Sequence, residues 1–466
     1  MAQHYDVAIV GSGPAGIFAA LEFCKSEGLD VLLLEKGRDL KRRVCPITGT
    51  SKTCPPCHPC AVVSGWGGAG AFSDGKLTLS PDVGGRLREY LGRDMTLELL
   101  QEVDQTYQHF GADNRLYGVD EAAEDLRRRA SLAELRLVPL PLRHIGTERC
   151  RDVLQAMRDY LSPRVEIRTG ANVKSLVAED GHVQGIVDDE EQRYEADYVI
   201  VAPGREGADW LAKESRRLGL TLSLNPVDVG VRVEVPATVT EELTSHLYES
   251  KLEYFSKTFD DRIRTFCMCP AGEVTMESTG GADPVTTVNG HSYADRRTEN
   301  TNFALLTSTT FTEPFKDPIA YGRYIARLAN ILSGGVIVQR LGDLLEGHRS
   351  TPERIERSIV TPTLKSAIPG DLSFVLPYRY LNGIIEMLQA LDKLAPGVAS
   401  RHTLLYGVEV KFYSSRIQLS PHLETQVANL FAAGDGAGVT RGLAQASAAG
   451  IVAAREILRR LGKQQS

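Results

Sequence analysis

The sequence contains no long uninterrupted apolar run. A membrane-spanning helix needs roughly 18 or more consecutive apolar residues, and no stretch of the chain reaches that length. The apolar segment near the start is broken by glycines, and it has neither the basic leader nor the cleavage site of a secretory signal. We therefore expect a cytoplasmic protein with no membrane span.

The chain also lacks a strong excess of charge of either sign. Its 53 Lys and Arg against 60 Asp and Glu give a net charge of -7, so nothing favours a nucleic-acid partner. A hydrophobic content of 42% is typical of a soluble globular protein. The 466 residues exceed what one core usually holds, so two or three lobes are expected.

A glycine-rich segment follows the first apolar run. Residues 5–10 are apolar and lead into residues 11–16, after which apolar residues recur at helical spacing. This order predicts a strand, a tight turn and a helix. Gly11 permits the turn, Gly13 lets the backbone approach a pyrophosphate, and Gly16 lets helix and strand pack closely. The predicted dinucleotide-binding residues are Gly11, Ser12, Gly13, Pro14, Ala15 and Gly16.

A second predicted strand, residues 30–34, ends in an acid. Glu35 lies 24 residues after Gly11, where an acid binds the ribose 2'-hydroxyl of a dinucleotide. We expect Glu35 and Lys36 at the adenosine end of the cofactor. An adenosine without a 2'-phosphate is favoured.

Near the far end, residues 429–438 form an apolar strand that ends in Gly-Asp and precedes a helix of small residues. This segment resembles the second flavin signature of the glutathione-reductase-type flavoproteins. The resemblance implies that Gly434 and Asp435 bind the ribityl chain of FAD. It also implies that the backbone at Gly442, Leu443 and Ala444 faces the flavin carbonyl. A buried strand and helix without a ligand is the alternative.

A middle segment fits the same plan. Residues 165–168 and 172–187 alternate apolar and polar residues, as meander strands do. They lead to residues 196–205, which resemble the Ala-Thr-Gly turn of the same flavoproteins with proline in place of threonine. The resemblance adds Val173, Ala202 and Gly204 to the predicted cofactor-binding residues.

Together these motifs predict an α/β fold with a discontinuous Rossmann-like FAD-binding domain of glutathione-reductase type. We assign residues 1–80, 136–225 and 401–466 to that domain, 81–135 to a solvated helical insertion, and 226–400 to an inserted α+β substrate domain. Residues 226–400 contain no second glycine fingerprint. We therefore expect NAD(P)H only as a transient electron donor, with a ferredoxin-like donor as the alternative.

Further segments carry a resemblance to one family. Residues 67–77, the cysteines before them, residues 264–270 and residues 288–293 resemble the bacterial FAD-dependent dehydrogenases. Wider relatives are the geranylgeranyl-reductase-like and fumarate-reductase-like flavoproteins. The resemblance spans nearly the whole chain. It implies oxidoreductase activity but no established substrate.

Four of the eight cysteines are clustered. Cys45, Cys54, Cys57 and Cys60 follow the spacing Cys-x8-Cys-x2-Cys-x2-Cys, which could hold a 4Fe-4S cluster for electron entry. A closed zinc site, a redox thiol pair and inert thiols are the alternatives. The prolines of this segment make a stiff loop, whereas redox Cys-x-x-Cys motifs normally open a helix.

The catalytic candidates come from two places. Gly67 and Gly68 lie in a glycine-rich loop that could rest against a flat ring, and Asp74 and Lys76 follow it. A lysine there would stabilise negative charge on the flavin, although Asp74 and the next glycine could simply form a turn.

Residues 288–293 supply possible proton donors. His291 and Tyr293 could protonate a substrate during hydride transfer, although a lone histidine is usually structural or exposed. Cys267 and Cys269, two residues apart, would share one side of a strand. Buried structural thiols are the alternative reading of that pair.

These features predict an FAD-dependent dehydrogenase or reductase that passes a hydride between flavin N5 and a small organic substrate. Two alternatives remain. One is an FAD-dependent monooxygenase or oxidase. The other is a flavin electron-transfer protein with a structural zinc site.

Overall fold

The chain folds into two compact units. The computed structural model describes residues 3–46, 57–73, 75–223, 225–278, 284–292, 297–309, 317–411 and 415–463. Residues 1–116, 142–224 and 414–466 form the first unit, and residues 117–141 and 225–413 form the second. Residues 81–135, expected as one insertion, are thus divided between the two units at residue 116.

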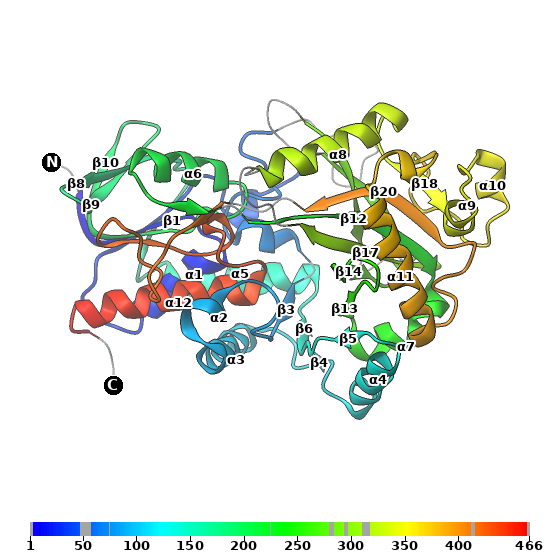
Figure 1. The fold of residues 1–466 in the computed structure, drawn as a ribbon. Coiled ribbons are helices and arrows are strands. Elements are labelled where there is room, and N and C mark those ends of the chain that lie inside the picture. The colour runs from blue at the N-terminus through cyan, green and yellow to red at the C-terminus, as the bar shows by residue number, and fades with distance from the viewer. Residues whose placement is uncertain are drawn as a thin grey trace. The chain divides into compact units, whose positions relative to one another are not determined.

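The first unit is built on a mainly parallel sheet (Figure 1). Its order is β7 (Glu166–Thr169), β2 (Val31–Glu35), β1 (Gln3–Val10), β10 (Arg193–Val201), β9 (His182–Asp188) and β8 (Val173–Glu179), and β22 (Leu430–Ala432) also pairs with β10. Strand β9 pairs antiparallel with both β8 and β10, while the other pairings of this sheet are parallel. A parallel sheet is covered on both faces, which explains why β2 is buried throughout.

Two helices from opposite ends of the chain run side by side in this unit (Figure 1). They are α1 (Pro14–Phe23) and α12 (Leu443–Arg460). A Cβ atom at Gly450 would lie 2.0 Å from the Ala15 carbonyl oxygen, so this contact requires glycine. Small residues along α12 therefore set how closely the two helices approach.

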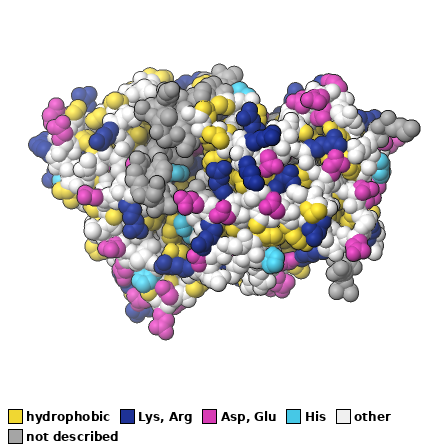
Figure 2. Space-filling model, turned by 180° about the vertical axis from the view of Figure 1, so that it is seen from behind, with side chains coloured by type: hydrophobic (Ala, Val, Ile, Leu, Met, Phe, Trp, Pro, Cys, Tyr) yellow, Lys and Arg dark blue, Asp and Glu magenta, His cyan; other side chains and the backbone are white. Residues whose placement is uncertain are grey.

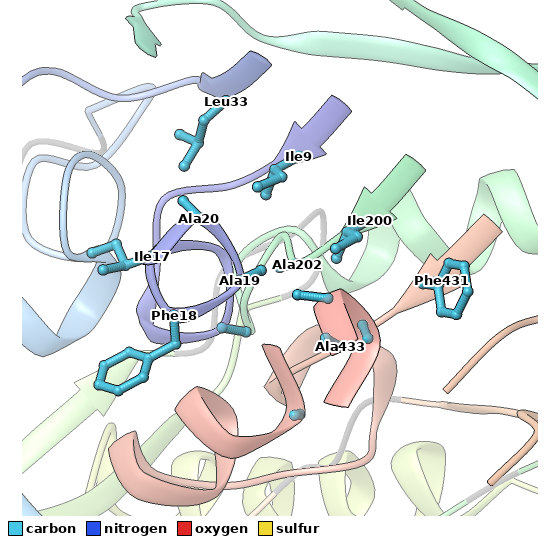
Figure 3. Packing of buried hydrophobic residues seen from close by; sticks show 14 of the residues in the cluster. Ile9, Ile17, Phe18, Ala19, Ala20, Leu33, Ile200, Ala202, Phe431 and Ala433 are labelled. Atoms are coloured by element: carbon cyan, nitrogen blue, oxygen red, sulfur yellow. The ribbon is translucent and has the colours of Figure 1, made fainter. Parts of the chain in front are cut away.

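Apolar side chains of the sheet cover α1 (Figure 3). Ile9, Leu33 and Ile200 come from three adjacent strands and belong to one buried cluster with Ala20 of α1. This core joins the N-terminal, middle and C-terminal segments of the unit.

The remaining elements of the first unit surround this core. They are η1 (Leu40–Arg42), η2 (Gly68–Phe72), β3 (Lys76–Thr78), α2 (Leu87–Leu91), α3 (Arg93–His109), β6 (Leu142–His144), α5 (Thr147–Leu161), α6 (Ala208–Arg217), β11 (Leu222–Ser223), β21 (Arg416–Ile417) and η4 (Asp435–Ala437). The two residues of β4 (Leu116–Tyr117) are divided between the units. Helix α3 buries Leu99, Leu100 and Val103 and packs on α12. Its amphipathic pattern therefore marks a core helix, not the solvated one that its charged residues suggested.

The second unit contains an eight-stranded sheet in its described residues. Its order is β19 (Ile368–Pro369), β18 (Ile337–Arg340), β20 (Leu404–Lys411), β12 (Val227–Pro236), β17 (Asn300–Thr309), β14 (Arg262–Cys269), β13 (Leu252–Phe255) and β5 (Arg136–Leu137). The pairings are antiparallel except that between β18 and β19. β15 (Glu273–Ser278) and β16 (Thr286–His291) form a separate hairpin.

Strand β12 has two buried faces of opposite character. The valines at alternate positions from Val227 to Val235 share one apolar cluster with residues of the surrounding helices. Those helices are α4 (Glu121–Leu132), α7 (Ala237–Leu247), α8 (Pro318–Ser333) and α11 (Tyr378–Leu394). The other face of β12 carries Asp228, Arg232 and Glu234, and all three are buried.

These observations confirm the predicted α/β class, with a discontinuous Rossmann-like unit and an inserted α+β unit. Figure 2 shows that cationic and anionic side chains both occur across the face drawn there. Within the described residues, no helix combines the length and the apolar character needed to span a membrane.

A buried carboxylate ties together the short helices α9 (Leu341–Leu345) and α10 (Pro352–Glu356). The short helix η3 (Leu372–Phe374) bonds instead to Gln339, through the Leu372 amide. Asp343 is fully buried and accepts hydrogen bonds from Arg340 at 2.6 and 2.9 Å, from Arg354 at 2.7 Å and from Ser350 at 2.6 Å. Burial acts to raise the pKa of this carboxyl, but the hydrogen bonds from Arg340, Ser350 and Arg354 outweigh it and hold the pKa well below its usual range.

We expect Asp343→Asn to destabilise the second unit by about 2–3 kcal/mol at pH 7, because charge-assisted hydrogen bonds are lost. A carboxyl with a depressed folded pKa stabilises fully above its unfolded pKa of about 3.9 and loses that contribution as the pH falls through the folded pKa. The gap between wild type and variant should therefore shrink below about pH 4. Urea unfolding monitored by far-UV circular dichroism measures this difference in the free energy of unfolding at each pH. Asp125→Asn, in an exposed pair, is the control.

Candidate functional site

The N-terminus of α1 is open to a ligand. Its cap is Gly13, whose φ is -72°, and no side chain of the described residues caps the helix. The first turn also lacks an acidic residue. The first backbone N–H groups of a helix have no intrahelical partner and carry partial positive charge. A Cβ atom at Gly13 would meet no atom within 4 Å, so the space beside this turn is open.

The other two glycines of the turn are fixed by close contacts. Gly11 has a φ of +101°, and a Cβ atom there would lie 2.3 Å from the Ala202 carbonyl oxygen. A Cβ atom at Gly16 would lie 1.9 Å from the Gly11 carbonyl oxygen. Larger residues would push apart β1, α1 and the turn after β10. Gly11 therefore permits the tight turn and Gly16 the close packing of helix and strand, as the sequence predicted.

The N-terminus of α12 meets the same region. Gly442 caps this helix with a φ of +106°, open space around its Cα and no side-chain cap within the described residues. A Cβ atom at Gly434 would lie 3.3 Å from the Ala15 Cβ atom, and one at Gly436 would lie 2.5 Å from the Gly204 carbonyl oxygen. The N-terminal turn, the turn after β10 and the segment after β22 thus converge.

Asp435 follows directly in η4. Its Oδ1 atom accepts a hydrogen bond of 2.9 Å from Thr440 Oγ1, and Arg205 Nε lies 3.8 Å from Oδ2. The carboxylate is one-fifth exposed. Burial raises the pKa of Asp435, while Arg205 and Thr440 oppose that rise. The side chain keeps acceptor positions that a ligand hydroxyl can use.

The glycine-rich loop after the cysteines lies on the glycine turn. The Gly67 amide donates a hydrogen bond of 2.9 Å to the Ser12 carbonyl oxygen. A Cβ atom at Gly68 would lie 3.1 Å from Gly13 Cα, and one at Gly70 would lie 2.8 Å from Leu443 Cδ2. The predicted Gly67 and Gly68 therefore lie against the glycine turn before α1, and Gly70 of the same loop lies against the first residue of α12.

Arg43 was missed by the sequence analysis, although it holds this loop in place. Its buried guanidinium donates to the carbonyl oxygens of Ala61, Val62 and Trp66 at 2.9, 2.8 and 2.6 Å. Burial lowers the pKa of Arg43 to about 10, against the opposing effect of Glu35. A lone basic residue before a cysteine segment gives no signal of such a role.

A small apolar pocket lies beside the two helix N-termini. Its lining comes from the glycine turn, the loop in front of it, α3, α5 and α12, and consists of Pro14, Gly67, Gly70, Tyr107, Ile145, Cys150, Val153, Leu154 and Leu443. Tyr107 and Cys150 were not predicted to lie here. A Cβ atom at Gly75 would lie 2.2 Å from Cys150 Sγ, so the loop packs tightly on α5.

Glu35 binds protein donors at both of its oxygens. Oε2 accepts from the Ser12 amide and the Ser12 hydroxyl, each at 2.9 Å, and Oε1 accepts from the amides of Gly37 at 2.8 Å and Gly65 at 2.9 Å. A carboxylate offers about four acceptor positions. Glu35 therefore fastens the glycine turn to the following loop, and its predicted ribose contact would require one of these donors to move.

We expect Glu35→Gln to destabilise the first unit by about 1–3 kcal/mol, because one oxygen that accepts two hydrogen bonds becomes a donor. Both tryptophans, Trp66 and Trp210, lie in the first unit, so fluorescence-detected urea unfolding of the apoprotein reports on it. The exposed Glu27→Gln serves as the control. Equal midpoints for both variants would contradict this reading of Glu35.

Two other predicted residues lie near Glu35. Lys36 forms an ion pair with Glu206, and burial lowers the pKa of its amine against the opposing charge of Glu35. The Ala171 amide donates a hydrogen bond of 3.0 Å to the Glu35 carbonyl oxygen. This bond places the start of β8, at Val173, beside the end of β2. Ala444 is buried in the first turn of α12.

The structure describes two of the four predicted catalytic residues, one in each unit. Lys76 begins β3 of the first unit, where its backbone pairs with His144. His291 ends β16 of the second unit and is exposed. Asp74 and Tyr293 lie outside the described residues. The roles of all four stay predictions.

The cysteine prediction falls partly outside the described residues. Cys45 and Cys60 are half-buried and Cys57 is exposed, while Cys54 lies outside them. Within the described ranges, no three His, Cys, Asp or Glu side chains are grouped so that they could hold a metal ion. The three described thiols therefore do not fit a metal site by themselves, and the cluster prediction gains no support from them.

Comparison with protein families gives two matches. Residues 226–412 match the family described as FAD-dependent protein, C-terminal domain-like. Residues 364–465 match the family described as glucose inhibited division protein A, and this range includes Gly434, Asp435 and α12. These matches support the predicted family of FAD-dependent proteins, with FAD as its cofactor.

The individual proteins that this chain resembles share low sequence identity with it. An uncharacterized protein of Clostridium beijerinckii is 26% identical over 475 residues, which span 97% of this chain and 80% of that protein. L-proline dehydrogenase from P. horikoshii is 11% identical, with a TM-score of 0.42 and coverage of 100% of this chain and 96% of that chain. Glycine oxidase from Geobacillus kaustophilus is 14% identical, with a TM-score of 0.39 and the same coverage.

Proposed function

We propose, from the premise that this chain belongs to a family of FAD-dependent proteins, that it is an FAD-dependent oxidoreductase whose first unit holds the cofactor. One observation carries the proposal. The uncapped N-termini of α1 and α12 lie beside one pocket, which Pro14 and Leu443 both line, and their cap residues Gly13 and Gly442 have open space at the Cβ position. Two positive helix ends suit a ligand that has anionic phosphates at one place and a ring gaining negative charge at another.

The residues present fit FAD. The first N–H groups of α1, beside Gly13, would hold the pyrophosphate. Asp435 would bind ribityl hydroxyls, and the backbone from Gly442 to Ala444 would face the flavin carbonyl. When bound, FAD supplies two-electron chemistry by accepting or donating a hydride at N5. The α12 terminus would favour negative charge on the reduced ring.

Two side chains are candidates for acting on the substrate. Lys76 is the candidate for stabilising negative charge near the ring, and His291 is the candidate for moving a proton to or from a small organic substrate. NAD(P)H and a ferredoxin-like protein remain the candidate electron donors. Because the three described thiols do not fit a metal site, no step is routed through a metal.

The experiment is an anaerobic purification followed by release and identification of the flavin. We expect one FAD per chain and bleaching of the flavin absorbance on photoreduction. A preparation without flavin that cannot be reconstituted would end the proposal. Reoxidation then separates the reaction classes. Slow reaction with oxygen supports a dehydrogenase or reductase, whereas fast peroxide release or substrate hydroxylation supports an oxidase or monooxygenase.

A further inference from the structure

The polar face of β12 holds a buried cluster of charged side chains around Arg232. Arg232 is fully buried and donates to both oxygens of Glu409, at 2.7 and 2.9 Å. Lys411 Nζ lies 3.2 Å from the same carboxylate. Two cations thus share one buried anion. Glu277 lies 3.7 Å from Lys411 but is half exposed, so solvent screens its charge.

A bulge in β14 brings two thiols to this cluster. The register of β14 shifts between Phe266 and Cys269, and Cys267 has a φ of +45°, which non-glycine residues rarely adopt. Arg232 Nη1 donates to the Cys267 carbonyl oxygen at 3.2 Å, and Cys269 Sγ donates to the same oxygen at 3.5 Å. Burial acts to lower the pKa of Arg232, but Glu409, Cys267 and Cys269 raise it.

A buried amide in the same place lacks an acceptor. Asn302 pairs directly with Cys269 across β14 and β17, and it is fully buried. Its Oδ1 atom accepts from Arg232 Nη1 at 2.7 Å, while its Nδ2 atom has no hydrogen-bond partner among the described residues. An unsatisfied buried donor costs about 1–3 kcal/mol. A negatively charged sulfur would supply the acceptor that this donor needs.

Two glycines bring backbone close to the cluster. A Cβ atom at Gly290 would lie 2.0 Å from Arg232 Nη1 and 2.2 Å from Asn302 Oδ1. A Cβ atom at Gly272 would lie 2.9 Å from Cys269 Cβ. Cys269 is 2% exposed, whereas Cys267 is only half-buried. The two thiols therefore differ in access, one reachable from outside and one enclosed.

We propose that Cys267 and Cys269 form a redox-active dithiol that reduces low-molecular-weight disulfides. The Cys267 thiolate attacks one sulfur of the disulfide, forms a mixed disulfide and releases one thiolate. The Cys269 thiolate then attacks the Cys267 sulfur, which closes the Cys267–Cys269 bond and releases the second thiolate. The two protons of the cysteine thiols end on the two released thiols. The protein loses two electrons and the substrate disulfide gains them.

The bulge makes this bond sterically reasonable. In a regular strand, Cα atoms two residues apart are separated by about 6.6 Å, near the upper limit of about 6.8 Å for disulfides. The left-handed backbone of Cys267 and the register shift take this segment out of regular strand geometry and re-aim its side chains. Arg232 acts as an electrostatic support, since a neighbouring cation favours the thiolate that performs exchange.

The test exposes the full-length purified protein to glutathione buffers of rising oxidised fraction. Iodoacetamide then blocks the remaining thiols, and peptide mass spectrometry follows. The tryptic peptide after Arg264 contains both cysteines. We expect it to lose two hydrogens and escape alkylation in oxidised buffer. Cys24, whose pKa burial raises to about 11, is the internal control and should stay reduced. In reduced protein at pH 7, Cys267 should be alkylated roughly tenfold faster than Cys24.

Two variants fix the order of the steps. Cys269→Ser should trap one glutathione on Cys267, because the resolving thiol is gone. Cys267→Ser should leave Cys269 unmodified, because the attacking thiol is gone. The proposal is overturned if the wild-type peptide stays reduced in every buffer, or if it carries stable glutathione without forming the internal bond. It is also overturned if Cys267→Ser exchanges as fast as wild type.

Discussion

Gly13→Glu should abolish FAD binding and leave the first unit folded. The backbone at Gly13 adopts angles open to any residue, and its Cβ position has no neighbour within 4 Å, so the side chain fits the apoprotein. Its carboxylate would lie at the uncapped N-terminus of α1, where it satisfies N–H groups that would otherwise hold the pyrophosphate. We expect FAD affinity to fall by at least about 100-fold, which corresponds to about 2.7 kcal/mol.

The measurement is a titration of apoprotein with FAD followed by flavin fluorescence, together with tryptophan-detected unfolding of the same apoprotein. Gly13→Ala is the matched control, because it adds a Cβ atom without charge at the same backbone position. Its loss of affinity should be smaller. Full FAD affinity in Gly13→Glu would show that the cofactor does not lie on α1. An unfolded apoprotein would contradict the open space that the structure shows beside Gly13.

Arg232→Met should destabilise the second unit by about 3–5 kcal/mol, the usual cost of removing one partner from a buried ion pair. Both Arg232 and Glu409 have no exposed side-chain surface, so the remaining carboxylate cannot reach water. Far-UV circular dichroism follows this loss. The tryptophan signal should hardly move, because Trp66 and Trp210 belong to the first unit.

The double variant Arg232→Met with Glu409→Leu separates charge from packing. Removing both charges should recover much of the lost stability, since well-packed apolar residues replace buried ion pairs at little cost. Arg262→Met breaks a pair whose arginine is 46% exposed and should change stability by no more than about 0.5 kcal/mol. A single variant as stable as wild type would show that solvent enters this cluster.

The sequence predicted site residues correctly where a local sequence pattern itself reflects a contact in the folded protein. Gly11 and Gly16 stand where close backbone contacts demand glycine, and Gly434 has a φ of +80°, so these glycines could be recognised before the structure was known. Arg43 could not be found this way, because its partners are three backbone carbonyls whose placement depends on the folded loop. Side-chain identity alone does not reveal such contacts.

Glu35 and α3 show two further limits. The position of Glu35 at the end of β2 was expected, but its four protein donors come from loops that sequence periodicity does not place. Helix α3 was expected to be solvated because residues 81–135 are rich in Leu, Glu, Asp and Arg, whereas its buried residues follow one stripe of the helix. The amino-acid composition averages over all faces of a helix, whereas packing depends only on the face that meets the core.

The meeting of α1 with α12 constrains how this protein is made. A ribosome synthesises β1 and α1 early, but the strand and helix that complete their sheet and core lie beyond residue 413. Residues 117–141 and 225–413 are translated in between, so the second unit can fold while the first is still incomplete. The nascent N-terminal segment must therefore wait with apolar surface uncovered, which makes it a natural client for chaperones that bind emerging chains.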